Sequence, residues 1–203
     1  MFALVQDGSI TKHLSGDKGV TIGDIQYPRN IFTLWSAEEK EAKGIYEVVF
    51  DNSNKRDETF YTNTNVSYAF ADGVVTASYG AATAKALADA NGTDADGVEL
   101  DPVVVIEGLK TKKIKIIKAQ AAGILEKTDW YILRKADADT DVPSAITTFR
   151  AAVRTKAAAM ETLVTNASNT AAIQTLYTYV NTADEGDPVV MERPLGEFPV
   201  LGS

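Results

Sequence analysis

Asn91-Gly92-Thr93-Asp94-Ala95-Asp96-Gly97-Val98-Glu99-Leu100-Asp101-Pro102 is the stretch that divides this chain of 203 residues. Turn-forming residues and acids follow one another there without an apolar period, which is typical of a linker. Aromatic residues are concentrated before the stretch and alanines after it. Because aromatic residues favour strands and alanine favours helices, the sequence predicts an α+β protein. Its predicted parts are a small strand-rich domain with short helices at 1–90, an acidic linker at 91–102, an antiparallel helical bundle at 103–182 and an extended C-terminal tail at 183–203.

Two Asp-Gly pairs, Asp7-Gly8 and Asp72-Gly73, organise the predicted N-terminal domain. Each separates two apolar runs, and the dipeptide favours the positive φ angles of a two-residue hairpin turn. The sequence therefore predicts two β-hairpins. The paired runs are 2–5 with 9–14, and 60–70 with 74–79.

A short helix and a strand are predicted between these hairpins. Ser36 and Glu39 have the spacing of a capping box, in which each side chain accepts a hydrogen bond from the other residue's backbone amide. Gly44 is a natural end for the helix, and residues 45–50 then favour a strand. The alanine-rich stretch 81–90 is predicted to close the domain as one or two helical turns.

Four helical segments are predicted in the second half. Apolar residues recur at helical spacing from Leu109 onward, and cap-forming residues at Thr128, Pro143 and Asn169 begin further helices. The short run 103–106 fits either a buried strand or the start of a helix, because periodicity cannot separate the two over four residues.

Composition narrows the classes of function. The chain has no cysteine and a single histidine, which excludes disulfides, thiolate zinc sites and thiol nucleophiles. The net charge of −8 argues against broad nucleic-acid binding. No run of about 18 apolar residues indicates a membrane span. Since the N-terminus lacks a basic signal-peptide region, we expect synthesis in the cytoplasm.

No motif predicts a catalytic, metal or cofactor site. Asp94-Ala95-Asp96-Gly97 resembles the middle of a calcium loop, but position twelve of that frame is Val103 where a bidentate Glu is needed. The glycine-rich stretch 16–23 has neither phosphate-loop nor dinucleotide-binding spacing. We therefore expect a protein that is not an enzyme and that needs neither a metal nor a cofactor.

One string in the second half resembles a known family. Thr128-Asp129-Trp130, followed by Arg134, Val142-Pro143 and then Phe149-Arg150 with Arg154, is similar to a pattern in tail proteins of tailed bacteriophages. Those proteins are catalogued as tail assembly chaperones or tail-fibre-associated proteins. The resemblance covers 109–180 best, and the segments 192–199 and 1–5 are similar to the ends of related proteins. It extends to nothing in 50–105.

The resemblance implies a protein that functions by binding other proteins. It predicts a structural or connector part of the virion tail that binds tail-fibre or baseplate proteins and is oligomeric in the particle, with no membrane or nucleic-acid partner. A tail-fibre chaperone that is not retained in the virion is the alternative. A third possibility is a host-glycan-binding module, with the rings of Tyr61, Tyr68 and Tyr79 stacked on sugars.

The residues of this string can also be given physical roles in a helical hairpin. Asp129 is predicted to cap the helix that carries Trp130. Arginines are predicted to meet carboxylates across the hairpin and so determine its register. Trp130 is interpreted as bundle core, with an interface anchor as the alternative. The predicted partner-binding or hairpin-fixing residues are Asp129, Trp130, Tyr131, Arg134, Phe149, Arg150 and Arg154.

Overall fold

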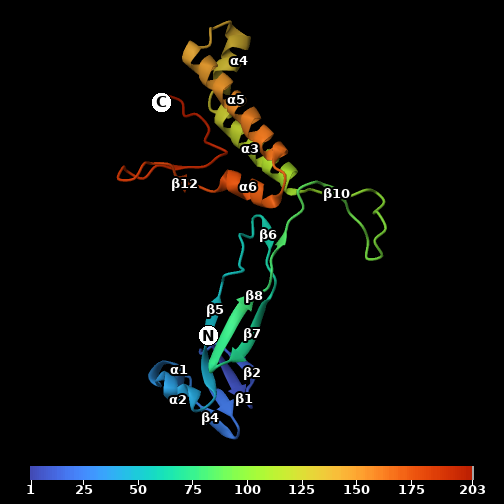
Figure 1. Ribbon diagram of the computed structural model, residues 1–203. Helices are drawn as coiled ribbons and strands as arrows, with labels where there is room; N and C mark the ends of the chain where they lie inside the picture. Colours follow the sequence, from blue (N-terminus) through green and yellow to red (C-terminus); the bar gives the residue numbers. More distant parts are fainter. Residues whose placement is uncertain (203) are drawn as a thin grey trace. The chain divides into compact units, whose positions relative to one another are not determined.

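The computed structural model describes residues 1–202 and is a mixed α+β protein, as predicted (Figure 1). The chain divides into two compact units, Met1–Thr83 and Ala84–Ser203. The predicted linker at 91–102 lies inside the second unit. Backbone hydrogen bonds hold that stretch in place, because the amide of Gly92 donates to the carbonyl of Val104 (2.7 Å) and the amide of Leu100 donates to the carbonyl of Gly92 (2.9 Å).

A five-stranded mixed sheet forms the first unit, with strand order β2-β1-β5-β8-β7. β5 and β8 run parallel, and the other neighbours are antiparallel. The edge strands β2 and β7 contact each other, so the sheet is curled. The elements are β1 (Phe2–Gln6), β2 (Ser9–Leu14), β3 (Val20–Ile22), β4 (Ile25–Tyr27), α1 (Ile31–Leu34), α2 (Ala37–Glu41), β5 (Ile45–Asp51), β6 (Tyr61–Thr62), β7 (Val66–Ala71), β8 (Val74–Tyr79) and β9 (Thr83–Ala84).

Both predicted hairpins are confirmed, although the first strand of the second hairpin begins at Val66 and not at Phe60. Asp7 and Gly8 have φ angles of 49° and 74°, and Asp72 and Gly73 have 50° and 75°. Positive φ at both central residues is the geometry of a type I′ turn, which matches the twist of the strands it joins.

The side chains of β1 alternate between the two faces of the sheet, and a separate core cluster lies on each face. Leu4 faces a cluster that α1 and β3 complete with Phe32 and Val20. Ala3 and Val5 face the opposite way, into a cluster with Val75. Because successive strand residues point to opposite faces, one apolar strand contributes to both layers. This explains why 2–5 is apolar without interruption.

The predicted capping box is confirmed at α2. The Ser36 hydroxyl accepts from the amide of Glu39 (3.2 Å), and the Glu39 carboxylate accepts from the amide of Ser36 (2.8 Å). The predicted helical turns at 81–90 are wrong, because this segment is extended and contributes to β9 and to β10. Its backbone forms hydrogen bonds with the first residues of the next long helix, because the carbonyls of Ala86 and Leu87 accept from the amides of Leu109 and Lys110.

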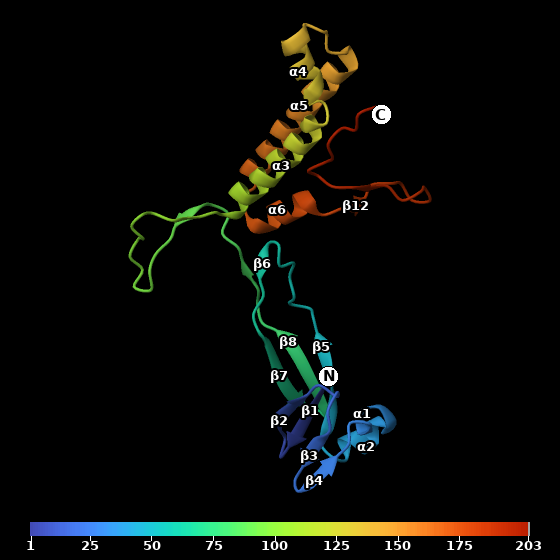
Figure 2. The same cartoon turned by 180° about the vertical axis from the view of Figure 1, so that it is seen from behind.

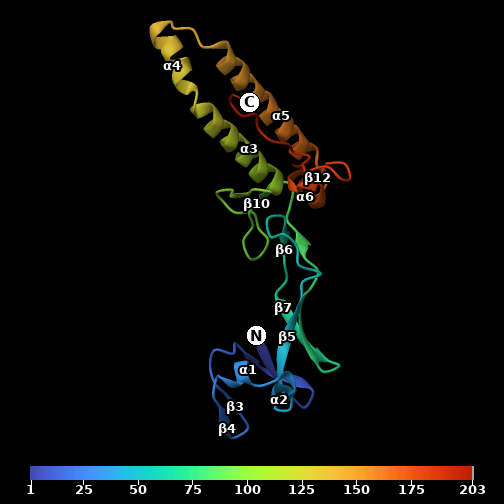
Figure 3. The same cartoon turned by 90° about the vertical axis from the view of Figure 1, so that its left-hand side faces the viewer.

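A helical hairpin dominates the second unit (Figures 2 and 3). α3 and α5 run antiparallel along each other, and α6 lies at the end of the hairpin away from α4. Ile117, Val153, Met160 and Ile173 are almost fully buried. The elements are β10 (Ala90–Asn91), β11 (Val105–Ile106), α3 (Leu109–Glu126), α4 (Asp129–Ala138), α5 (Ser144–Asn166), α6 (Thr170–Tyr177), β12 (Val180–Asn181) and β13 (Met191–Glu192).

The C-terminal tail returns to the helices. β12 and β13 first form a two-stranded ribbon. Leu195 is then buried, and its amide donates to the carbonyl of Leu176 in α6 (3.0 Å). Residues 196–200 form neither helix nor strand.

A distant carboxylate caps the first turn of α3. Gly108 is the N-cap and has no side chain to offer, but the Asp89 carboxylate accepts from its amide (2.8 Å) and from the Thr111 hydroxyl (3.0 Å). These hydrogen bonds, the backbone one first, lower the pKa of Asp89. A carboxylate near a helix N-terminus is also favoured by the helix dipole.

This cap predicts a pH dependence. Because the folded pKa of Asp89 lies below the unfolded value of about 3.9, the stabilisation is complete above that value and is lost as the pH falls through the folded pKa. Asp89→Asn keeps an oxygen acceptor but does not ionise. We expect its unfolding free energy to fall less steeply than that of the native chain below about pH 4, as measured by urea titrations at several pH values. Identical slopes would contradict the cap.

Candidate functional site

Arg150 lies at the point where the hairpin changes direction. It comes from α5, is only 7% exposed, and projects toward the break between α3 and α4. Three oxygens surround its Nη1 atom: the carbonyl of Leu125 at 2.8 Å, the Thr128 hydroxyl at 2.7 Å and the Asp129 carboxylate at 2.7 Å. One guanidinium therefore holds the end of α3 and the beginning of α4 together.

The local backbone explains why a cation belongs there. The carbonyls in the last turn of α3 have no helical partner, and the C-terminal end of a helix carries partial negative charge. Arg150 lies at that end and adds a hydrogen bond to the Leu125 carbonyl, which also accepts from the Thr128 amide (3.0 Å). Thr128 is buried as well, and its hydroxyl donates to the carbonyl of Leu125 (2.9 Å) while it accepts from Arg150.

Asp129 has a different role from the one predicted. Thr128, and not Asp129, is the N-cap residue of α4, and no side chain caps that helix end by a hydrogen bond. The Asp129 carboxylate instead pairs with Arg150. The prediction of a cap is wrong because Asp129 already has helical geometry in the first turn, where its side chain is free to turn toward the cation on α5.

The Arg134 guanidinium stacks on the rings of both aromatic residues of α4, Trp130 and Tyr131. Its guanidinium carbon lies 4.8 Å from the centroid of the Trp130 ring and 5.6 Å from that of Tyr131, and the two rings are 3.8 Å apart. Trp130 and Arg134 are four residues apart and so lie on one helix face. Within residues 1–202 the buried Nε of Arg134 has no hydrogen-bond partner.

The interpretation of Trp130 as bundle core is wrong. Its side chain is 50% exposed, and Leu133 is more exposed still. α4 has no buried residue at all. The chain breaks at Thr128, and on the new helix that follows no other segment of residues 1–202 covers Trp130 or Leu133. Trp130, Tyr131, Leu133 and Arg134 are called the α4 surface below.

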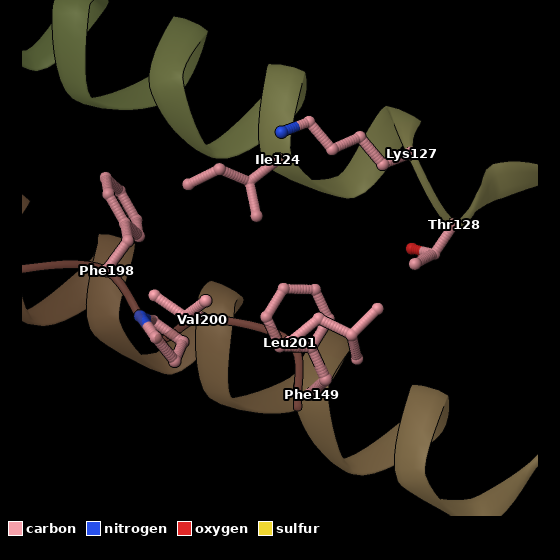
Figure 4. A pocket seen from close by; sticks show the side chains of 8 residues that line it. Ile124, Lys127, Thr128, Phe149, Phe198, Val200 and Leu201 are labelled. Atoms are coloured by element: carbon pink, nitrogen blue, oxygen red, sulfur yellow. The ribbon is translucent and has the colours of Figure 1, made fainter. Parts of the chain in front are cut away.

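Arg154 and Phe149, the remaining predicted site residues on α5, lie in different environments. Arg154 is exposed and forms no ion pair within the described chain, so its predicted register contact is not formed. Phe149 faces the C-terminal tail across a cavity of about 390 Å³ (Figure 4). Ile124 lines the α3 side of this cavity, and Phe198 and Leu201 line the tail side. These tail residues were not predicted, although Phe198-Pro199-Val200-Leu201 is an apolar run within 183–203.

The tyrosines considered for glycan binding have structural contacts. Tyr68 packs against the sheet cluster that contains Ala3 and Val75, and its ring centroid lies 4.2 Å from that of His13. The Lys55 ammonium lies 5.6 Å from the centre of the Tyr79 ring. Tyr61 is half-buried. The ring of Tyr68 is therefore used to join the edge strands β2 and β7.

Neither a metal-binding cluster nor a membrane-spanning helix is present in the described part of the chain. Residues 1–202 contain no group of three or more His, Asp or Glu side chains placed to hold a metal ion. Asp94, from the calcium-like stretch, accepts instead from the amides of Asp96 (3.0 Å) and Val98 (2.9 Å). No helix in residues 1–202 has the length and apolarity needed to cross a bilayer.

Comparisons with protein-family models, curated proteins and solved structures find no match to this chain. The class that can be stated from its own geometry is a mixed α+β protein with a helical hairpin. That hairpin is braced by a buried arginine and carries an exposed aromatic surface on α4.

Proposed function

We propose that this protein is a non-enzymatic structural or connector part of a bacteriophage tail, which binds tail-fibre or baseplate proteins through the α4 surface. The α4 surface is the observation that carries the proposal. The similarity of Thr128–Trp130, Arg134, Phe149-Arg150 and Arg154 to tail proteins supplies the biological setting. The proposal includes retention in the virion after synthesis in the host cytoplasm.

The composition of the α4 surface supports binding to a protein. Tryptophan, tyrosine and arginine are the residues most enriched among those that contribute strongly to binding free energy. Here all three lie on one helix, and Arg134 stacks on both rings. Stacking restricts the side chains before a partner arrives, which reduces the entropy lost on association. The Arg150–Asp129 pair restrains the helix that carries them.

Mass spectrometry of purified particles tests the assignment to the virion. We expect the chain in particles together with tail-fibre and baseplate proteins, and chemical cross-links from α4 to one of them. Its absence from particles that contain intact fibres would instead favour the chaperone alternative. Its absence from phage-infected cells altogether would overturn the tail assignment.

Trp130→Ala separates binding from folding. Because the ring is half exposed, we expect the unfolding free energy to change by less than about 1 kcal/mol, well below the 3–5 kcal/mol of a core tryptophan. Affinity for the tail partner is expected to fall more than tenfold, as for a central aromatic in an interface. Chemical denaturation and copurification from infected cells measure the two effects.

Phe50→Ala is the matched control, since Phe50 is also an aromatic side chain about half exposed but lies in the first unit. It should leave copurification unchanged. Equal loss of the partner in both variants, or a normal complex with Trp130→Ala, would contradict binding through the α4 surface.

A further inference from the structure

Four consecutive apolar residues, Val103 to Ile106, are exposed in the ribbon that precedes α3. Each side chain is between 52% and 57% exposed. Successive strand residues point to opposite faces, so both faces of this segment are uncovered. Exposed valine and isoleucine in an unbroken run are unusual for an isolated soluble domain and mark a site of association.

The segment also has an open backbone edge. β11 belongs to a two-stranded sheet whose other strand is β10, so within residues 1–202 one side of β11 carries no neighbouring strand. The Val104 carbonyl accepts from the amide of Gly92 and therefore points toward β10. Because backbone groups alternate in direction along a strand, the amide and carbonyl of Val105 point toward the open side. An apolar edge of this kind is a template for another strand.

The exposed area of the chain is large enough for a stable interface. Its accessible surface is 13307 Å². Two separate globular domains of these sizes would together expose roughly 11,000 Å². The excess of roughly 2,000 Å² equals or exceeds what a stable protein–protein interface buries.

We propose that the open edge of β11 pairs antiparallel with β11 of a second copy, which produces a four-stranded β10-β11-β11-β10 sheet. A two-fold axis lets the same edge serve both copies. The register is centred on Val105, opposite its counterpart, with Val104 opposite Ile106. The inference does not rest on the tail function proposed above.

Charges and chain limits favour this register. Centring the pairing on Val104 would place Asp101 of one copy opposite Glu107 of the other, and opposed like charges destabilise a sheet. Centring it on Val105 places Glu107 opposite Val103 instead. Pro102 lacks an amide and α3 begins at Leu109, so the pairing is confined to residues 103–107.

Val105→Pro and Val105→Lys in the full-length chain test the edge. Proline removes the amide that faces the partner but not one that faces β10, and lysine places two like charges opposite each other on the axis. We expect the native chain to sediment as a dimer at tens of micromolar and both variants to dissociate at least ten times more readily. Circular dichroism should report unchanged helix content.

Val98 supplies the control, because it is equally exposed in the same ribbon but lies outside β11. Val98→Lys should remain dimeric. A monomeric native chain, or a dimer that both Val105 variants leave intact, would overturn the proposal.

A cross-link tests the register separately. Since the chain has no cysteine, Val105→Cys carries the only thiol. Cα atoms of an opposed hydrogen-bonded pair lie about 5.5 Å apart, within the range that a disulfide spans. Mild oxidation should give a covalent dimer much faster from Val105→Cys than from Val98→Cys. Equal rates would contradict the register.

Discussion

Arg150→Ala is expected to lower the free energy of unfolding of the helical unit by about 3 kcal/mol. The side chain is buried. Its Nη1 atom donates hydrogen bonds to the Leu125 carbonyl and the Thr128 hydroxyl and forms an ion pair with the Asp129 carboxylate. Truncation leaves the buried Thr128 hydroxyl without its donor and Asp129 without its cation. Asp129 is half exposed, so water can replace part of the ion pair, which keeps the loss below that of a fully buried pair.

Arg154→Ala is the natural control. Arg154 lies one turn further along α5 and is exposed, so we expect a change within about 0.5 kcal/mol. Arg150→Lys should fall between the two, since an ammonium keeps the charge but lacks the planar fork of a guanidinium. Urea denaturation followed by circular dichroism measures all three variants. Similar losses for Arg150→Ala and Arg154→Ala would disprove the bracing role of Arg150.

Gly44→Ala is expected to destabilise the first unit by at least about 3 kcal/mol. Gly44 follows α2 with a φ angle of +75°, which costs an L-residue with a side chain about 1–2 kcal/mol. In addition, a Cβ atom there would collide with the backbone carbonyl oxygen of Val5 in β1. The carbonyl cannot withdraw, because the Val5 amide donates to the Gly44 carbonyl (2.7 Å) and holds the two segments together.

Gly8→Ala isolates the contribution of the collision. Gly8 has nearly the same φ angle, +74°, but a Cβ atom there would meet nothing within 4 Å. We expect it to cost only the conformational strain of about 1–2 kcal/mol. Thermal and urea unfolding of the two variants should therefore differ by more than about 1 kcal/mol. Equal losses would mean that β1 can move away from Gly44 without penalty.

Local patterns in the sequence predicted local structure well. The Asp7-Gly8 and Asp72-Gly73 turns need only the two residues that adopt positive φ, and the Ser36 capping box needs only residues three apart. The helices of the hairpin follow from apolar spacing over many turns. Each of these features depends on neighbours in the chain, so the residues themselves carry the information.

The candidate site was predicted only in part. The sequence indicated that an arginine on α5 would meet a carboxylate across the hairpin, and the structure brings Arg150 to Asp129. It also indicated that a new helix begins after Thr128, but not that Trp130 would be exposed on that helix. It also missed the tail residues that face Phe149. These contacts join residues distant in sequence, and no periodicity encodes them.

The sequence by itself determined the α+β character of the chain, its tight turns and the capped starts of α2 and α6, because steric preferences and hydrogen bonds within a few residues decide them. Only the tertiary structure decided which apolar residues are buried. Val103–Ile106 and Trp130 look like core in the sequence and are exposed in the structure, since burial depends on whether another segment arrives to cover a side chain. The same dependence made Asp89 a cap for a helix that begins 20 residues later.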